Sequence, residues 1–119
     1  MADISISPGR LTELAVAICR ASGSDETEAR AVATNLVDAN LTGHDSHGVG
    51  MLPIYIDAVR RGALALGMTP KVVSRTAATL VVDGQRGYGQ TVMAEAMDLL
   101  CDQAKQAGAA VLALRNTHQ

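Results

Sequence analysis

The sequence predicts an α/β protein in which a helical N-terminal part precedes a segment of strands and one helix. Apolar residues recur at helical spacing up to about residue 61, whereas short β-branched runs begin after Pro70. Hydrophobic residues make up 48% and charged residues 18% of the 119 residues, which is typical of a globular chain of domain size. We expect a division into residues 1–66 and 67–119.

The first part begins with two expected helices. Ser7 precedes Pro8 as an N-cap and first-turn pair, and the apolar spacing that follows predicts a helix ending at Gly23. Ser24 is the expected cap of a second helix, which ends at Gly43. A tight turn between two such helices predicts an antiparallel hairpin whose end leads directly into a glycine-rich loop.

A third helix and a linker are expected before the strands begin. Dense apolar residues predict a helix over residues 52–61, with Pro53 tolerated in its first turn. Residues 63–70 have the composition of a linker, and the domain boundary is placed there.

The second part changes to the strand period. The expected order is a hairpin, a glycine loop, a helix and an apolar strand, over residues 72–82, 83–89, 90–106 and 109–114. The loop glycines, Gly84, Gly87 and Gly89, are spaced G-x-x-G-x-G rather than as the dinucleotide fingerprint G-x-G-x-x-G. We interpret this loop as a turn that needs positive φ and close packing between strand and helix.

Composition excludes several classes of function. The formal net charge of −2 and the scattered Lys and Arg residues argue against a nucleic-acid partner. No run approaches the ~20 apolar residues of a membrane span, and no targeting signal is visible, so no membrane partner is expected. Cys19 and Cys101 lie among apolar helical neighbours, which favours reduced core thiols and a cytoplasmic protein.

The core and the chain end suggest an incomplete unit. Tyr55 and Tyr88 are the two aromatic residues, so the core must be built mainly from smaller aliphatic side chains. The sequence stops directly after an apolar strand-like run. We therefore expect a truncated N-terminal fragment.

The stretch GHDSHGVGMLP carries the candidate chemistry. Its histidine at position 47 follows Ser46 in a loop bounded by glycines, and imidazole exchanges protons near neutral pH. The alternative for His47, a loop side chain bonded to backbone, stays open. His44 is interpreted as a cation at a helix end and Asp45 as a turn residue bonded to its own backbone. Clustering of these ligand types within a few residues is not the spacing of a metal site, so no metal is expected.

Three stretches together resemble the N-terminal third of the malate/L-lactate dehydrogenase family. They are NLVDANLTGHDSHGVGMLPIYIDAVRRGAL, VVDGQRGYGQ, and AAVLALRNT after the intervening helix. The form GHDSHGVGMLP looks most like the hydroxycarboxylate dehydrogenase branch. The resemblance implies a helical N-terminal part followed by the start of a mixed-sheet, three-layer α/β/α cofactor domain. That domain is of the non-Rossmann, L-sulfolactate dehydrogenase-like type, and the expected assembly is a homodimer.

The resemblance also implies site residues. The histidine of the SHG motif, here His47, is the acid/base group, and Ser46 is its hydrogen-bonding neighbour. The cofactor loop begins around the RNT element, so the implied contacts to NAD or NADP fall on four consecutive residues: Asn116, Thr117, His118 and Gln119. Many members carry an arginine at the position of Met51, so the resemblance supplies no substrate-binding arginine there.

Two functions follow as expectations. The first is an oxidoreductase that transfers a hydride between NAD(P)(H) and a small 2-hydroxy or 2-keto acid, the fragment alone being inactive. The second is a non-catalytic helical piece for interaction or dimerisation. The sequence does not distinguish NAD from NADP or name the acid.

Overall fold

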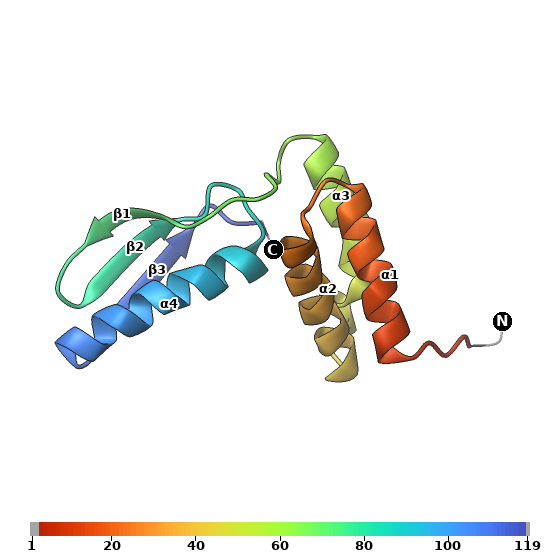
Figure 1. Ribbon diagram of the computed structural model, residues 1–119, viewed down its shortest axis with the longest axis horizontal. Helices are drawn as coiled ribbons and strands as arrows, with labels where there is room; N and C mark the ends of the chain where they lie inside the picture. Colours follow the sequence, from red (N-terminus) through yellow and green to blue (C-terminus); the bar gives the residue numbers. More distant parts are fainter. Residues whose placement is uncertain (1–2, 119) are drawn as a thin grey trace. The chain divides into compact units, whose positions relative to one another are not determined.

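The computed structural model describes residues 3–118, and its elements confirm the predicted mixed α/β class. Helices and strands follow the expected order of three helices, two strands, a helix and a strand (Figure 1). Their bounds are α1 Pro8–Ala21, α2 Glu26–Leu41, α3 Leu52–Arg60, β1 Lys71–Arg75, β2 Thr79–Asp83, α4 Gly89–Ala107 and β3 Val111–Arg115. The chain divides into two units, one ending at Arg60 and the other beginning at Arg61. The boundary expected between residues 66 and 67 stays a prediction.

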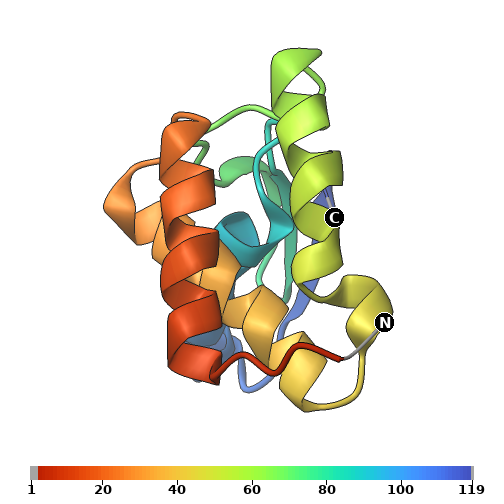
Figure 2. The ribbon, with the colours of Figure 1, turned by 90° about the vertical axis from the view of Figure 1, so that its right-hand side faces the viewer.

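In the first unit, α1 and α2 form the predicted antiparallel hairpin (Figure 2). Helix α3 also contacts α1. Their buried residues include Glu28 on α2, and the hydrophobic ones are small or aliphatic apart from one tyrosine. They are Ala15, Val16 and Cys19 on α1, Ala29, Val32, Ala33, Leu36 and Val37 on α2, and Leu52, Tyr55 and Ala58 on α3. Each fully buried Val or Leu contributes about 1.5–3 kcal/mol relative to an exposed one. The loop that follows α2 therefore begins at the end of a well-packed helix.

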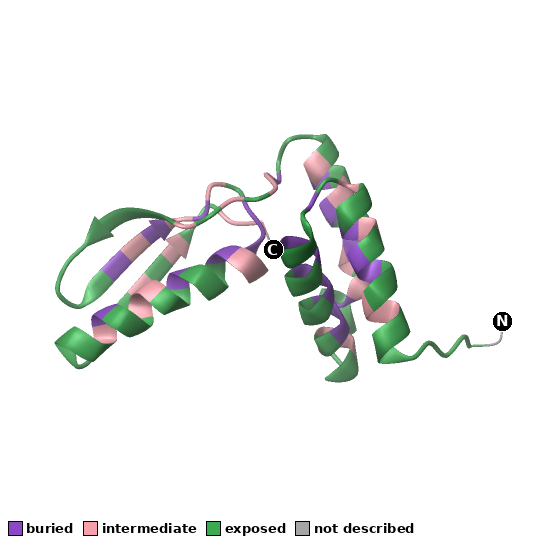
Figure 3. Ribbon diagram, viewed as in Figure 1, coloured by how far each residue is buried: buried purple, intermediate pink, exposed green. Residues whose placement is uncertain are grey.

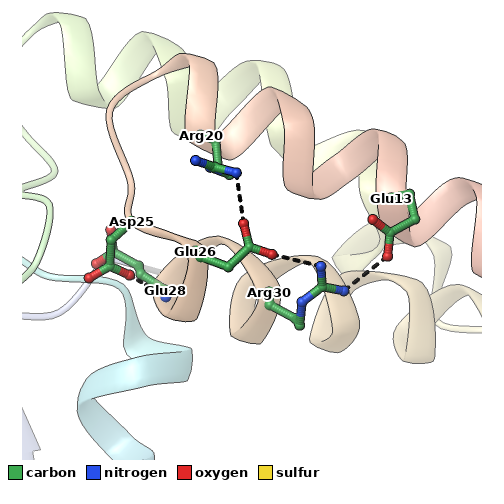
Figure 4. Close-up of polar contacts among 6 residues, drawn as sticks. All are labelled: Glu13, Arg20, Asp25, Glu26, Glu28 and Arg30. Atoms are coloured by element: carbon green, nitrogen blue, oxygen red, sulfur yellow. Dashed lines mark hydrogen bonds and ion pairs between the residues drawn. The ribbon is translucent and has the colours of Figure 1, made fainter.

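The cap of α2 corrects one prediction. Ser24 was expected at the N-cap, but Asp25 occupies it, and its carboxylate accepts a hydrogen bond of 2.8 Å from the backbone N–H of Glu28 (Figure 4). Ser24 is instead buried in the turn. Both residue types are good caps, so the choice depends on where the backbone first becomes helical. At α1, Ser7 is the N-cap as predicted, without a side-chain cap bond.

Ion pairs cross the exposed side of the α1–α2 hairpin. Arg30 on α2 contacts Glu13 on α1 at 2.9 Å and Glu26 on its own helix at 2.7 Å, and Arg20 reaches Glu26 at 2.9 Å (Figure 4). The hydrogen bond from Arg30, and secondarily the charge of Arg20, hold the pKa of Glu26 below its usual range. All four side chains are largely exposed, so these pairs orient the helices more than they stabilise them.

The described part of the second unit contains a three-stranded mixed sheet in the order β1-β2-β3. The predicted hairpin is confirmed because β1 and β2 pair antiparallel, with an irregularity between Val72 and Ser74. β2 and β3 pair in parallel, and α4 connects them. Figure 3 shows buried residues on β2 and a fully exposed β1. Leu80, Val82 and Ala96 form the core between β2 and α4, with Leu99, Leu112 and Leu114 packed around it.

The glycine loop after β2 bears out only half of its interpretation. Close packing against the helix is confirmed, because a Cβ on Gly87 would lie 3.0 Å from one methyl carbon of Val92 on α4, and a Cβ on Gly84 would lie 3.3 Å from the other. Positive φ is found instead at Gln85 and Arg86, at 55° and 65°. The glycines are therefore required for space, while two residues with side chains take the left-handed conformation.

Of the two cysteines expected in the core, Cys19 is buried as predicted and Cys101 is not. Cys19 is buried, and this burial, with the Glu28 carboxylate, raises the pKa of its thiol. Cys101 was expected in the core but is exposed on α4. The segment 63–70 lacks helix and strand, yet Leu64 within it is buried. No helix within residues 3–118 has the length and apolarity that crossing a bilayer requires.

Candidate functional site

The end of α2 aims the chain into the candidate loop. Gly43 has a φ of 80°, and its N–H donates to the carbonyl of Asn40, while the N–H of His44 donates to the carbonyl of Ala39 at 2.8 Å. These paired bonds form a Schellman motif, which favours glycine at the left-handed position. The motif ends the helix and sets the direction of the next residues.

The loop is more regular than its glycines predict. Two short 3₁₀ turns, Asp45–His47 and Val49–Met51, follow one another and lead into α3. The N–H of His47 donates to the carbonyl of His44 at 2.9 Å, and the N–H of Gly48 to that of Asp45 at 3.1 Å. The backbone around His47 therefore has a defined path despite its exposure.

Ser46 and His47 form a hydrogen-bonded pair. The Ser46 hydroxyl oxygen lies 2.9 Å from Nδ1 of His47, and both side chains are exposed. With Nδ1 engaged, Nε2 is the ring nitrogen that can exchange a proton with a substrate. The ring of His44 meets that of His47 edge to face, with centroids 4.9 Å apart and planes at 86°. The pair can thus serve as an oriented acid/base group.

The side chain of Asp45 makes a different hydrogen bond from the one predicted. It was expected to bond its own backbone, but its Oδ1 accepts a hydrogen bond of 2.7 Å from Nδ2 of Asn40. Across residues 3–118, no three His, Cys, Asp or Glu side chains come together as a potential metal site.

Asn40 is the site residue that the sequence reasoning missed. Its Oδ1 accepts a hydrogen bond of 2.9 Å from the N–H of Val49, while its Nδ2 donates to Asp45. A Cβ on Gly48 would lie 2.3 Å from that same Oδ1. Asparagine is a poor helix former, so its place in the last turn of α2 was a signal available in the sequence.

A second cluster surrounds Asp83 at the end of β2. Asp83 Oδ1 accepts hydrogen bonds from Nδ2 of Asn116 at 2.9 Å and from the N–H of Gln85 at 2.8 Å, and Arg115 lies 3.4 Å from Oδ2. The Asn116 amide, then the Gln85 N–H and Arg115, hold the pKa of Asp83 below its usual range. Asn116 itself has a φ of 55°. Asp83 thereby ties the glycine loop to the residues after β3.

The residues expected to contact a cofactor lie in this second unit. His118 is joined to the glycine loop, because its N–H donates to the carbonyl of Gly87 and its carbonyl accepts from the N–H of Gly89. Thr117 places its methyl group against Gly84. Gln119 lies outside the described residues. Asn116, Thr117 and His118 are thus held together beside the glycine loop.

Asn116 also borders a groove within the second unit. Three basic side chains and one acid line it, together with two amide and four apolar side chains. The lining includes Lys71, Asp83, Gln85, Arg86, Arg115 and Asn116. Guanidinium and ammonium groups bind phosphate well, so the charges of this groove suit an anionic ligand.

Comparison with known proteins identifies the family to which this chain belongs. The sequence model of the family described as malate/L-lactate dehydrogenase matches residues 6–119. Hydroxycarboxylate dehydrogenase B of Escherichia coli O157:H7 is 44% identical over 102 residues, which cover 86% of this chain and 28% of that protein. The chain therefore spans less than a third of that relative.

Solved structures agree in fold. Sulfolactate dehydrogenase from Methanocaldococcus jannaschii superposes with a TM-score of 0.89 at 35% identity, covering 98% of this chain and 34% of that one. Malate dehydrogenase from Pyrococcus horikoshii OT3 gives a TM-score of 0.90 at 33% identity, covering 98% and 33%. Because the sequence model of the malate/L-lactate dehydrogenase family matches residues 6–119 and these solved structures share its fold, the chain belongs to that family.

Proposed function

We propose that the protein containing this chain is a NAD(P)-dependent oxidoreductase that interconverts a small 2-hydroxy acid and the corresponding 2-keto acid. The observation that carries the proposal is the hydrogen bond of 2.9 Å between Ser46 and Nδ1 of His47 on an exposed turn. The relatives named hydroxycarboxylate, sulfolactate and malate dehydrogenases support this substrate class. Met51 stands where the family resemblance implies an arginine, so the proposal assigns no carboxylate-binding role to that position.

His47 acts as the acid/base group in this proposal. In the reducing direction its ring donates a proton to the alkoxide that develops from the keto group, and in the oxidising direction it accepts the hydroxyl proton. Ser46 holds Nδ1, so that Nε2 is the proton-exchanging atom. A bound nicotinamide supplies or accepts the hydride. The protein side of the reaction is therefore an oriented imidazole at neutral pH.

Asn116, Thr117, His118 and Gln119 are the proposed cofactor contacts. The first three fit this role because they are fixed beside the glycine loop and Asn116 borders a groove with basic side chains. Arg86 and Arg115 on that groove are suited to a dinucleotide's phosphates. NAD and NADP both remain within the proposal.

Substitution of His47 tests the proposal in the full-length protein. His47→Ala should lower kcat by roughly 10² to 10⁴-fold, the usual contribution of a positioned acid/base group. The exposed turn should still fold, because the side chain supports no core. His44→Ala, which removes the neighbouring ring, is the matched control and should have a much smaller effect.

The pH dependence of the rate is a second test of His47, made on the wild type and on His47→Gln. A proton-donating imidazole makes the reducing rate fall as pH rises, and a proton-accepting one makes the oxidising rate fall as pH drops. The two wild-type profiles should therefore be opposed, and His47→Gln should flatten both. Parallel profiles, or full turnover in His47→Ala, would remove His47 from the reaction.

We further infer that the protein is a cytoplasmic homodimer, as the family resemblance implies. The second candidate function, a non-catalytic interaction piece, is supported by β3, which is an edge strand of the described sheet and carries the exposed Val111. Both the homodimer and the interaction piece predict that the chain self-associates.

A further inference from the structure

We propose that Asn40 is a positioning residue that fixes the turn bearing Ser46 and His47. This inference rests on the proposed acid/base role of His47. Asn40 lies in the last turn of α2, and in this proposal it contacts neither the substrate nor the cofactor. Its function is to keep the imidazole in one place relative to the substrate.

The two hydrogen bonds of Asn40 bracket the catalytic pair. Its Nδ2 donates to Asp45 at 2.7 Å, and its Oδ1 accepts from the N–H of Val49 at 2.9 Å. Asp45 begins the first 3₁₀ turn and Val49 begins the second. Ser46 and His47 lie between these two anchors, so one amide restrains the backbone on both sides of them.

The support and the loop differ in packing. The helix that carries Asn40 is buried one turn earlier on the same face, where Leu36 and Val37 lie in the core of the first unit. Residues 41–47 are all exposed, so apolar burial does little to hold them. An exposed turn next to a packed helix depends on polar contacts for its order. Asn40 supplies two such contacts from the rigid side.

The contact is also close and directional. A Cβ on Gly48 would lie 2.3 Å from Asn40 Oδ1, so the amide rests directly against the loop backbone. Its NH₂ faces a carboxylate and its carbonyl oxygen faces an N–H, and a flipped amide would set donor against donor and acceptor against acceptor. Asparagine therefore meets both requirements, whereas aspartate would face Asp45 with like charge.

The test exchanges the two partners in the full-length protein. Asn40→Asp loses the donor and opposes two carboxylates, and should lower kcat about 10 to 100-fold with KM within about threefold, because a misplacement of about 1 Å can cost roughly 10²-fold. The double variant Asn40→Asp/Asp45→Asn restores an amide–carboxylate pair with its polarity reversed and should recover most of kcat. Asn35→Asp, the same change on an exposed part of α2, is the matched control and should keep wild-type kcat.

The outcomes separate this inference from the proposed function. Wild-type kcat in Asn40→Asp, or a double variant no better than Asn40→Asp, overturns the positioning role when His47→Ala still shows its loss of kcat of roughly 10² to 10⁴-fold. Full turnover in His47→Ala overturns the proposed function and this inference with it. If Asn40→Asp does not fold by circular dichroism, Asp45→Ala breaks the same bond from the exposed side. A loss of kcat at constant KM in that variant supports the role, and wild-type kcat overturns it.

Discussion

The side chain of Asn40 occupies the space that a Cβ on Gly48 would need. The φ of Gly48 is −87°, so its backbone would accept an alanine, but the added Cβ would lie 2.3 Å from Asn40 Oδ1. The requirement for glycine at this position is therefore steric. It comes from a helix side chain eight residues earlier in the sequence.

Gly48→Ala should destabilise the first unit by about 1–3 kcal/mol, the usual cost of forcing an extra carbon into a packed contact. Gly50→Ala is the control, because nothing lies within 4 Å of a Cβ there. Urea unfolding of both variants measures the difference. In the double variant Asn40→Ala/Gly48→Ala the losses should not add, because Asn40→Ala removes the obstacle. Additive losses would contradict the steric explanation.

Because of Asp83, the second unit should lose stability as the pH becomes acidic. Its folded pKa is lowered by Asn116, Gln85 and Arg115, so its stabilising contribution is present above the unfolded pKa near 3.9 and is lost as pH falls through the lower folded value. Asp83→Asn should lower Tm at pH 7 and differ less from wild type near pH 2.

Thermal unfolding at several pH values measures this effect, with Asp98→Asn on the exposed side of α4 as the control. A Tm difference between wild type and Asp83→Asn that is constant over this range would show that the charge of Asp83 contributes nothing to the fold.

At the scale of an element, the start of α2 distinguishes two adjacent cap candidates. Asp25→Ala removes the acceptor of the Glu28 N–H and should cost about 1 kcal/mol, within the usual range of 0.5–2 kcal/mol for an N-cap. Ser24→Ala should cost less, because the Ser24 hydroxyl makes no cap bond and is buried in the turn. Chemical denaturation of the two variants side by side decides between them. A larger loss for Ser24→Ala would return the cap to the position predicted from sequence.

At the scale of the whole chain, the outer edge of β3 is the surface to test for association. Edge strands present backbone N–H and C=O groups to other strands, and Val111 on β3 is 67% exposed. Val111→Lys should shift a concentration series of the 119-residue chain towards the monomer mass of 12.3 kDa in light scattering after size exclusion.

Ile54→Lys on α3 is the control for this experiment, since it also replaces an exposed apolar residue but lies on a helix. Equal dissociation by both variants would indicate general hydrophobic adhesion. Association that neither variant changes would place the interface elsewhere.

Local patterns predicted most of the fold, and the errors have physical causes. Helical and strand periods predicted the element order, and α4 ends at Ala107, one residue past the predicted bound, with Gly108 at a φ of 85° as its C-cap. Cys101 was misplaced because Leu99 and Leu100 directly precede it in the sequence, while the helix turns it towards solvent. Ser24 was misplaced because the sequence shows two suitable caps and not which residue leaves the helix.

The sequence by itself determined that Ser46 and His47 can form a pair, because neighbours in a turn lie within reach of one another. It could not show that Asn40 holds that turn or that Asp83 holds Asn116, contacts that join residues 9 and 33 positions apart. Nor could it show that Gln85 and Arg86, rather than the glycines beside them, take positive φ. These features depend on the path of the backbone between distant residues. Tertiary packing decides that path, whereas helix and strand periodicity are written in consecutive residues.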